Sequence, residues 1–299
     1  MPTALLYNPA AGRGLAPRLR DRALRAARAH WPRIELLETE RAGDGVRLAQ
    51  DAAQSGFEQL LVLGGDGTVH EAANGVLGSR APELPPIGVI PCGTGNDFAK
   101  LVGTAHCRPE EAIRRLANGT LARFDVGEAW GEFFVNSAGI GLDADVAHEL
   151  RTVKRLRGTA AYALALLRTL RAFRPRRLDV TIGAETWSDR WTAVVLGNGP
   201  VEGGSFRLTP SARPDDGELD LCAVTELPMA RLLALIPTLF WGGHGGYREV
   251  RLRRVTTVTI RSPDEPLHLH LDGELRSTGA REVTIQVRAA SLPVLVGRR

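Results

Sequence analysis

Short apolar runs that alternate with helical segments are the feature that most constrains the fold of the first third of this chain. Four such runs, ALLYNP, IELLET, LLVLGGDG and IGVIPCGTG, begin at residues 4, 34, 60 and 87. Between them lie RLRDRALRAARAH, GVRLAQDAAQ and VHEAANGVL, whose apolar residues have helical spacing. Strands that alternate with helices predict a parallel sheet with helices packed on its faces.

Three of the loops that follow these runs are rich in glycine and polar residues. They cover residues 8–14, 64–68 and 93–96. In open parallel sheets, ligands bind outside the carboxyl ends of the strands, which is where these loops are expected to lie. The sequence therefore predicts a ligand site at this edge of the sheet.

The pattern changes after Phe124 to β-rich runs separated by turn residues. These runs are LDVTIG, WTAVVLGNG, GELDLCAV, RRVTTVTI, LHLHLDGE and EVTIQVRA. They predict an antiparallel second domain, interrupted by helical insertions at residues 159–173 and 229–241. We expect an α/β nucleotide-binding domain at residues 1–125, a second domain at 126–287, and a tail at 288–299 that returns to the first domain.

Composition excludes several classes of protein. With 43% apolar and 24% charged residues, the chain is typical of a globular protein and not of a disordered or fibrous one. No apolar run approaches the ~20 residues needed to span a bilayer, and the start of the chain does not resemble a secretory signal. We expect a cytoplasmic protein. The three cysteines lack the spacing of a zinc site or a disulfide framework, so they are interpreted as buried thiols.

The GGDGT motif at residues 64–68 indicates a phosphate site. Its glycines allow successive backbone N–H groups to face an anion, and a helix that begins near Thr68 adds its positive end. Asp66 would repel a phosphate unless a divalent cation such as Mg²⁺ bridges the two. A turn that is merely rich in glycine is the alternative, but Glu71 in the helix behind the motif favours the nucleotide interpretation.

Two further loops strengthen this interpretation when all three are taken together. NPAAGRG supplies Asn8 and Gly12, and PCGTGND supplies Thr94 and Asn96, whose polar groups can bind phosphate or ribose. None of the loops fits the GxxxxGK[ST] phosphate loop or the GxGxxG dinucleotide fingerprint.

The late LDGE segment allows two interpretations. Asp-Gly is common in two-residue hairpin turns, so the residues alone favour a hairpin. The alternative is a carboxylate that accepts the proton of an attacking hydroxyl group and so assists the reaction by ~10²–10⁴-fold.

Several motifs, taken in order along nearly the whole chain, resemble those of one enzyme family. They are NPAAGRG, GGDGTVHEAANGV, PCGTGNDFAK, FVNSAGIGLDADV, LTPSARPDDGELDL and LDGE. The set is similar to the bacterial diacylglycerol kinase and related lipid kinase family, whose catalytic domain is shared with sphingosine and ceramide kinases. The resemblance implies ATP in a cleft between an α/β domain and a β-sandwich, and transfer of the γ-phosphoryl group to a lipid hydroxyl.

The resemblance also implies roles for particular residues. It places Glu274 as the general base, with Asp272 as a metal-binding or orienting partner. It implies a structural Mg²⁺ on the carbonyls of Arg213 and Glu218 and the side chain of Asp216, although an acidic β-turn is the default interpretation of this segment. It assigns ATP binding to Asn8, Thr39, Gly65, Asp66, Gly67, Thr68, Glu71, Thr94 and Asn96.

A basic insertion indicates a possible membrane contact. Residues 151–177 contain nine basic and no acidic residues, namely Arg151, Lys154, Arg155, Arg157, Arg168, Arg171, Arg174, Arg176 and Arg177. Within the two insertions, Tyr162, Leu166, Leu170 and Phe173, and then Leu232, Leu235, Ile236 and Leu239, repeat at helical spacing and are followed by Phe240 and Trp241.

Docking on anionic lipid at the inner membrane face is one interpretation of these insertions. Packing of the apolar faces on their own domain is the other. Nucleic acid is a poorer partner for the basic segment, because no recognised binding module accompanies it.

His268 and His270 alternate with leucines, and we interpret them as polar packing on a solvated strand face and not as a zinc site.

Two alternative functions remain open. NAD kinase also carries a GGDGT loop, but its reaction does not require the GTGND loop, the DGE motif or the basic insertion. A catalytically silent nucleotide- or lipid-binding regulator is the second alternative, against which the intact Asp66 and Glu274 argue. The sequence does not distinguish diacylglycerol from a sphingoid base, ceramide or a polyprenol, and it leaves open whether the protein is a homodimer.

Overall fold

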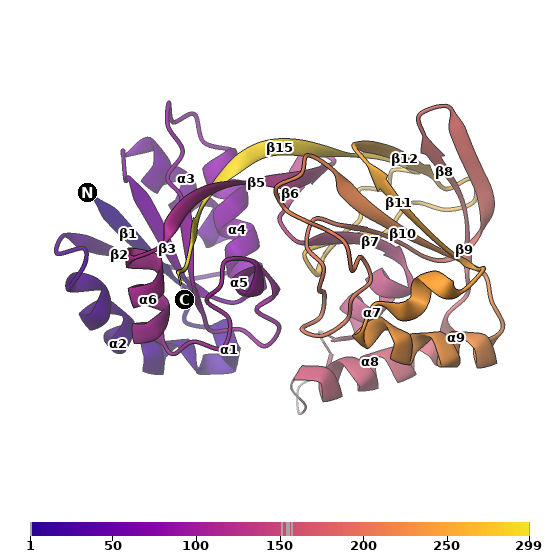
Figure 1. Cartoon of the computed structure of the whole chain (residues 1–299), viewed down its shortest axis with the longest axis horizontal. Coiled ribbons are helices and arrows are strands. Elements are labelled where there is room, and N and C mark those ends of the chain that lie inside the picture. The colour runs from indigo at the N-terminus through magenta and orange to yellow at the C-terminus, as the bar shows by residue number, and fades with distance from the viewer. Residues whose placement is uncertain (1, 151, 154–155, 157, 299) are drawn as a thin grey trace. The chain divides into compact units, whose positions relative to one another are not determined.

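The computed structural model describes residues 2–150, 152–153, 156 and 158–298 (Figure 1). Contacts within the chain divide it into two compact units. Unit 1 consists of Met1–Phe124 and Ala290–Arg299, and unit 2 is Asp125–Ala289. Strands β5 (Thr120–Ala129) and β15 (Glu282–Val296) each contain one of the boundaries.

Unit 1 is built on a parallel sheet. Its strands are β1 (Thr3–Tyr7), β2 (Ile34–Glu38), β3 (Gln59–Gly64) and β4 (Ile87–Pro91), in the spatial order β4–β3–β1–β2. The end of β15 pairs in parallel with β4, with Val294 opposite Ile87. The predicted parallel sheet is therefore confirmed.

Helices cover both faces of this sheet, whose strands β1, β3 and β4 are apolar and buried on both sides. Helices α2 (Ala16–Arg28) and α6 (Pro109–Ala117) pack on one face, together with Leu5, Leu61 and Ile90. Helices α3 (Asp44–Gln54) and α4 (Asp66–Leu77) pack against each other. The short helices α1 (Ala11–Gly14) and α5 (Asp97–Leu101) follow β1 and β4.

Helix α4 begins at Asp66 and not near Thr68, so the predicted start is two residues late. Gly65 is its N-cap in an extended conformation, and Asp66 is the first helical residue. A carboxylate at this position interacts favourably with the positive end of the helix. The GGDGT motif is therefore a strand end joined directly to a helix, without a separate loop.

Unit 2 is antiparallel, as predicted. One path of strands runs β14 (Glu274–Arg276), β13 (Leu269–Leu271), β7 (Ser137–Gly141), β9 (Glu185–Gly197), β8 (Arg176–Ile182), β12 (Thr257–Arg261) and β15. Strand β10 (Leu219–Thr225) joins β9 to β11 (Val250–Val255), and β6 (Glu132–Phe134) pairs with β5. An apolar core that includes Trp191, Phe134 and Ile260 lies within these strands.

The helices of unit 2 lie together beside the strands (Figure 1). They are α7 (Leu142–Leu150), α8 (Gly158–Ala172), α9 (Met229–Leu235) and the 3-10 turns η1 (Ile236–Phe240) and η2 (Gly243–Gly246). The predicted insertions are present, but the second changes from α to 3-10 helix next to Pro237. Among the described residues, no helix has the length and apolar character that crossing a membrane requires.

The cysteines differ in environment. Cys92 and Cys222 are buried as expected, whereas Cys107 is partly exposed, so that prediction is wrong for Cys107. Complete burial raises the pKa of the Cys222 thiol to about 12, and the carboxylate of Asp143 adds to this effect. Cys222 is therefore a protonated packing residue at neutral pH.

Candidate functional site

Two of the glycine-rich loops of unit 1 touch each other through their backbones. A Cβ atom on Gly65 would lie 2.9 Å from the Cα of Gly93, and one on Gly93 would lie 2.6 Å from the Cα of Gly65. Both positions therefore require glycine. Asn96, in the left-handed conformation (φ 51°), holds the second loop: its Oδ1 accepts from Gly93 N at 2.7 Å and its Nδ2 donates to Gly93 O at 2.9 Å.

Asn8 connects the loop after β1 to the GGDGT motif after β3. Its Nδ2 donates to the hydroxyl of Thr68 at 3.3 Å, and its Oδ1 accepts from Ala10 N at 2.9 Å. Thr68 is buried in the first turn of α4. Asn8 and Thr68 therefore connect two loops that lie 60 positions apart in the sequence.

Asp66 completes the connection on the other side. Its Oδ1 accepts a hydrogen bond from Phe98 N, at the start of α5, at 3.2 Å. Its side chain is half-buried at the positive end of α4. A half-buried carboxylate can still offer lone pairs to a cation, so Asp66 fits a Mg²⁺ ligand in the type of its donor atoms.

The remaining predicted ATP residues have different surroundings. Both oxygens of Glu71 accept from the backbone at the start of α3, from Gly43 N at 3.0 Å and Gly45 N at 2.9 Å. Glu71 thus caps a helix. The backbone of Thr39 donates to Tyr7 O at 3.0 Å, and Thr94 is exposed. Hydrogen bonds and backbone contacts link five of the predicted ATP residues, namely Asn8, Gly65, Asp66, Thr68 and Asn96. Thr39, Glu71 and Thr94 are not linked to this set by those contacts.

In unit 2, the LDGE segment is a hairpin between β13 and β14, as the residues alone favoured. Leu271 pairs with Glu274, and the two turn residues Asp272 and Gly273 have φ values of 51° and 84°. Two positive φ values are typical of a type I′ turn. This turn places Glu274, half-buried, at the first position of β14.

The side chain of Asp272 anchors the turn. Its carboxylate accepts hydrogen bonds from Val135 N (2.9 Å), Asn136 N (2.8 Å) and Ser137 N (3.1 Å). The backbone N of Asp272 donates to Ser137 O at 2.8 Å. These bonds suit the orienting role considered for Asp272, because they fix the residue two positions before Glu274.

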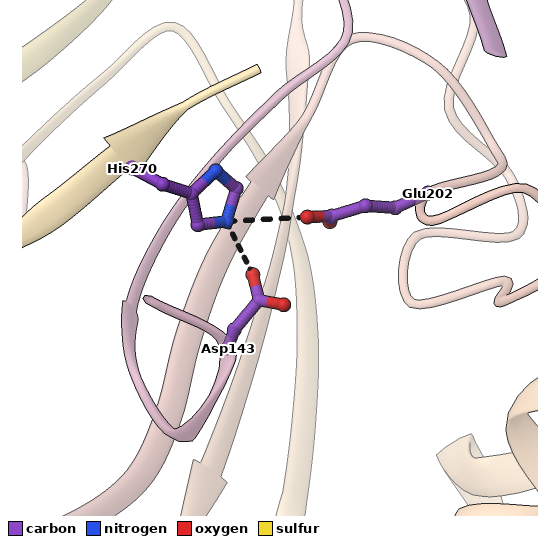
Figure 2. A group of neighbouring side chains, drawn as sticks. All are labelled: Asp143, Glu202 and His270. Atoms are coloured by element: carbon purple, nitrogen blue, oxygen red, sulfur yellow. Dashed lines mark hydrogen bonds and ion pairs between the residues drawn. The ribbon is translucent and has the colours of Figure 1, made fainter. Parts of the chain in front are cut away.

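A buried cluster that sequence reasoning missed lies next to this turn. Figure 2 shows Nε2 of His270 directed toward Asp143 and Glu202, at 2.6 and 3.2 Å. The His270 side chain is fully buried, so the interpretation of a solvated face is wrong for His270; His268 is exposed. Asp143 belongs to the AGIGLDADV segment of the sequence. Sequence reasoning missed the cluster because Glu202 and His270 lie far from Asp143 along the chain.

The hydrogen bonds of the ring define its tautomer. The carboxylates of Asp143 and Glu202, which push the pKa of His270 upward against the effect of burial, both act on Nε2. They therefore favour the hydrogen that Nε2 carries in either form of the ring, and Nδ1 decides whether the ring is charged. A second proton would have to enter at Nδ1, which already accepts the N–H of Gly273 at 3.1 Å. We therefore assign the neutral ring with its hydrogen on Nε2.

This tautomer is unsuited to metal binding. Asp143, Glu202 and His270 bring their donor atoms within 4.8 Å of one another, which is a spacing that a metal ion could use. A neutral histidine that binds a metal through Nε2 donates its other N–H to a neighbour. Here Nδ1 accepts instead, so the cluster fits a hydrogen-bonded network better than a metal site.

Gly139 leaves the space for this cluster, and its replacement provides a stability test. A Cβ atom there would lie 2.1 Å from Asp143 Oδ2 and 2.5 Å from His270 Nε2. Gly139→Ala is therefore expected to destabilise unit 2 by ~1–3 kcal/mol through overpacking, measured by chemical unfolding. The control is Gly246→Ala, whose methyl group would meet no described atom within 4 Å. Equal stability of the two variants would contradict the cluster geometry.

The acidic turn proposed for a structural metal already holds a cationic side chain. The guanidinium of Arg254 contacts the carboxylate of Asp216 and lies 2.8 Å from that of Glu218. Gly217 N donates to Asp125 at 2.7 Å, so the turn is tied to β5. Asp216 offers a suitable oxygen ligand for Mg²⁺, but a metal ion would share that carboxylate with Arg254.

An apolar pocket lies among the helices of unit 2. Its lining includes Leu166, Phe206, Leu232 and Leu239, with Asp143 as a carboxylate in the wall. Its volume is about 60 Å³. This is far below the ~300–1,000 Å³ of a typical ligand pocket. A lipid chain would therefore need the surrounding helices to move.

Two family models match the chain. The model described as "Diacylglycerol kinase catalytic domain" matches residues 2–129, and that described as "YegS C-terminal NAD kinase beta sandwich-like domain" matches residues 136–296. A Chromohalobacter salexigens protein named "Probable lipid kinase YegS-like" is 32% identical over 79% of this chain and 76% of its own length. This chain belongs to the bacterial diacylglycerol kinase and YegS-like lipid kinase family.

Two further comparisons agree with the family assignment. A protein of Bacillus subtilis (strain 168) named "Diacylglycerol kinase" is 26% identical over 90% of this chain and 88% of its own length. A solved structure of a diacylglycerol kinase from Bacillus anthracis str. Sterne has a TM-score of 0.74 at 23% identity, and covers 99% of this chain and 96% of that chain. The latter shows the same fold.

Membership of this lipid kinase family makes the chain a phosphotransferase enzyme. The predicted combination of an α/β domain with a C-terminal β-sandwich is confirmed. The description of the second family model compares its β-sandwich with that of NAD kinase. The likeness concerns the fold of this domain and does not favour NAD kinase activity.

Proposed function

We propose that the protein transfers the γ-phosphoryl group of ATP, with Mg²⁺, to the hydroxyl group of a lipid, most simply diacylglycerol. The observation that carries this proposal is the joining of three loops around Asp66 at the start of α4, through the Gly65–Gly93 contact and the Asn8–Thr68 hydrogen bond. Backbone N–H groups and the end of a helix favour phosphate there.

In this proposal the loops of unit 1 bind the triphosphate. Gly65, Gly67 and the backbone at the start of α4 face its oxygens, while Asp66 offers a ligand to Mg²⁺. When bound, Mg²⁺ would neutralise charge on the transferring group. Asn8, Thr68, Thr94 and Asn96 are assigned polar contacts to phosphate or ribose, and Thr39 and Glu71 support the edge of the site.

Unit 2 is proposed to supply the base and the lipid-binding surface. Glu274 accepts the proton of the lipid hydroxyl as that oxygen attacks phosphorus, because an alcohol is a weak nucleophile at neutral pH. Asp272 orients the turn that carries Glu274. The apolar pocket is a candidate entrance for an acyl chain. A sphingoid base or ceramide is the alternative acceptor.

One assay tests the reaction. Purified protein is incubated with γ-labelled ATP, Mg²⁺ and either NAD or vesicles that contain diacylglycerol, ceramide or a sphingoid base. We expect label in diacylglycerol phosphate. Label in NADP would support the NAD kinase alternative, and no transfer to any acceptor would support the silent regulator.

We also infer contact with the inner membrane surface, but through residues other than those predicted from periodicity. Leu170, Phe173, Leu232 and Leu235 are buried in the core beneath the helices, and Tyr162, Leu166, Ile236 and Leu239 pack against it. The exposed apolar side chains of these two insertions include Leu167, Met229, Leu233, Phe240 and Trp241, with Trp241 64% exposed.

Exposed arginines accompany these apolar side chains in unit 2. Arg168, Arg171, Arg174 and Arg177 are exposed, and Arg176 is half-buried. Arg168 is paired with Glu149 at 3.1 Å. The other basic residues of the insertion, Arg151, Lys154, Arg155 and Arg157, lie outside the described residues. Arg171 is therefore expected to contribute more to anionic-lipid binding than Arg168.

Vesicle sedimentation measures this contribution. At ~1 kcal/mol per basic residue, Arg168→Gln with Arg171→Gln is expected to weaken binding to phosphatidylglycerol vesicles by roughly five- to thirty-fold. Trp241→Ala should weaken it further. Arg25→Gln with Arg28→Gln, which removes two exposed charges from α2, is the matched control. Binding that does not depend on salt, or an equal loss in the control, would remove the proposed surface. Light scattering in the same buffers tests whether the protein is a homodimer.

A further inference from the structure

We propose that His270 is a positioning residue for Glu274: its imidazole holds the Asp272–Gly273 turn in the place where Glu274 can accept a proton. This inference rests on the proposed role of Glu274 as the base. His270 itself does not need to touch the substrate. Its contribution is to couple the catalytic hairpin to α7 and to the segment after β9.

The turn is held at both of its residues. Asp272 is fixed by its carboxylate and its N–H, which bond to the backbone of residues 135–137. Gly273 is fixed by its N–H, which donates to Nδ1 of His270 at 3.1 Å. Gly273 directly precedes Glu274, so His270 binds the Asp272–Gly273 peptide unit, one residue before the proposed base.

The ring in turn has little freedom. Asp143, on α7, and Glu202, after β9, both approach Nε2, and the His270 side chain is completely buried (Figure 2). Two backbone hydrogen bonds fix the loop that carries Glu202. Glu202 N donates to Phe206 O at 2.7 Å, and Phe206 N donates to Glu202 O at 2.9 Å. The Nδ1 acceptor is therefore presented to Gly273 in one orientation.

This arrangement has a kinetic consequence. Displacement of a catalytic group by ~1 Å can cost on the order of 10²-fold in rate. If the bond from Gly273 to His270 is lost, the turn keeps Asp272 as its anchor but loses a hydrogen bond at the residue that precedes Glu274. We expect kcat to fall, while the KM for ATP, whose proposed binding loops belong to unit 1, should change little.

Two substitutions separate the two ends of the ring. In an asparagine the Oδ1 atom takes approximately the place of Nδ1, so His270→Asn retains an acceptor for Gly273. In a glutamine the Nε2 atom takes approximately the place of the imidazole Nε2, so His270→Gln retains a donor for Asp143 and Glu202 but not the acceptor. We expect His270→Gln to lower kcat by ~10²-fold and His270→Asn by less than ~10-fold.

A purely structural role would give the opposite order. Loss of the donor to two buried carboxylates should destabilise His270→Asn more than His270→Gln, so thermal unfolding of both variants is measured in parallel. His268→Gln, an exposed position two residues away, is the control. A kcat for His270→Gln equal to or higher than that of His270→Asn would overturn the proposal.

A double-mutant cycle with Glu274→Gln distinguishes this inference from the proposed function. If His270 acts through Glu274, His270→Gln should lower kcat no further when Glu274 is already glutamine. Additive losses would refute positioning while retaining the base. Unchanged turnover in Glu274→Gln alone would refute the base itself.

The tautomer is tested without turnover. The ¹⁵N chemical shifts of the His270 ring should identify an unprotonated Nδ1 and a protonated Nε2, and the Gly273 amide shift should change in His270→Gln but less in His270→Asn. A protonated Nδ1 in the wild-type protein would refute the hydrogen bond on which the inference depends.

Discussion

Glu274→Gln is expected to lower kcat by ~10²–10⁴-fold while binding of Mg²⁺ and ATP is retained. The glutamine amide is nearly isosteric with the carboxylate but cannot accept the proton of the attacking hydroxyl. The substitution leaves Asp272, Gly273 and the His270 contact in place, so the hairpin should form as before. The measurement is single-turnover transfer from labelled ATP to diacylglycerol vesicles, with calorimetry for ATP.

The control for this variant is Glu282→Gln, an exposed carboxylate in β15. It should have normal turnover. A Glu274→Gln enzyme with wild-type kcat would exclude Glu274 as the base. Loss of ATP affinity together with kcat would instead point to misfolding or to a role in binding the nucleotide.

Asp66→Asn is expected to lower kcat/KM by roughly 10²–10³-fold, because the proposed site loses the charge that holds Mg²⁺ beside the phosphates. The asparagine Oδ1 can still accept the N–H of Phe98, which Asp66 accepts at 3.2 Å. The first turn of α4 should therefore remain intact. Calorimetric titration with ATP should show a weaker dependence on Mg²⁺ than in the wild-type protein.

Asp51→Asn in α3 is the matched control, since Asp51 forms an exposed pair with Arg47 at 3.0 Å. Surface pairs of this kind contribute ~0.3–0.5 kcal/mol, so its kinetics should be normal. Wild-type kcat/KM and Mg²⁺ dependence in Asp66→Asn would remove the metal role of Asp66. A lowered unfolding temperature would mean that the carboxylate acts mainly on the loop.

The architecture could be predicted because it follows from local patterns. Short strands followed by helices specified a parallel sheet, and glycines at the carboxyl ends of β3 and β4 marked the places where two backbones meet. The Asp272–Gly273 pair predicted a hairpin turn, and the structure contains one with both φ values positive. The hairpin interpretation and the catalytic proposal for Glu274 are thus compatible.

Long-range partners could not be predicted in the same way. His270 meets Asp143 across 127 positions of sequence, and periodicity alone gives no sign of that contact. Alternation with leucine correctly identified a strand, but it did not reveal that His270 would be covered by α7 and by the segment that carries Glu202.

Interpretations of side-chain function were limited by competing structural tasks. Glu71 lies behind a nucleotide-type loop, yet its carboxylate caps α3. The apolar stripe of α8 has the spacing of a membrane-binding helix, yet Leu170, and Phe173 directly after the helix, fill a core. Periodicity identifies an apolar face but does not identify what will cover it.

The pairing of Val294 with Ile87 has a consequence for biosynthesis. The segment Ala290–Arg299 is translated after all of unit 2, yet it supplies a neighbour for β4. During synthesis, β4 therefore keeps one edge unpaired while about 165 residues of unit 2 emerge from the ribosome. Contacts between such distant segments slow folding, and an uncovered strand border is prone to association with other chains. Expression of a version that stops at Ala289 should consequently yield inclusion bodies.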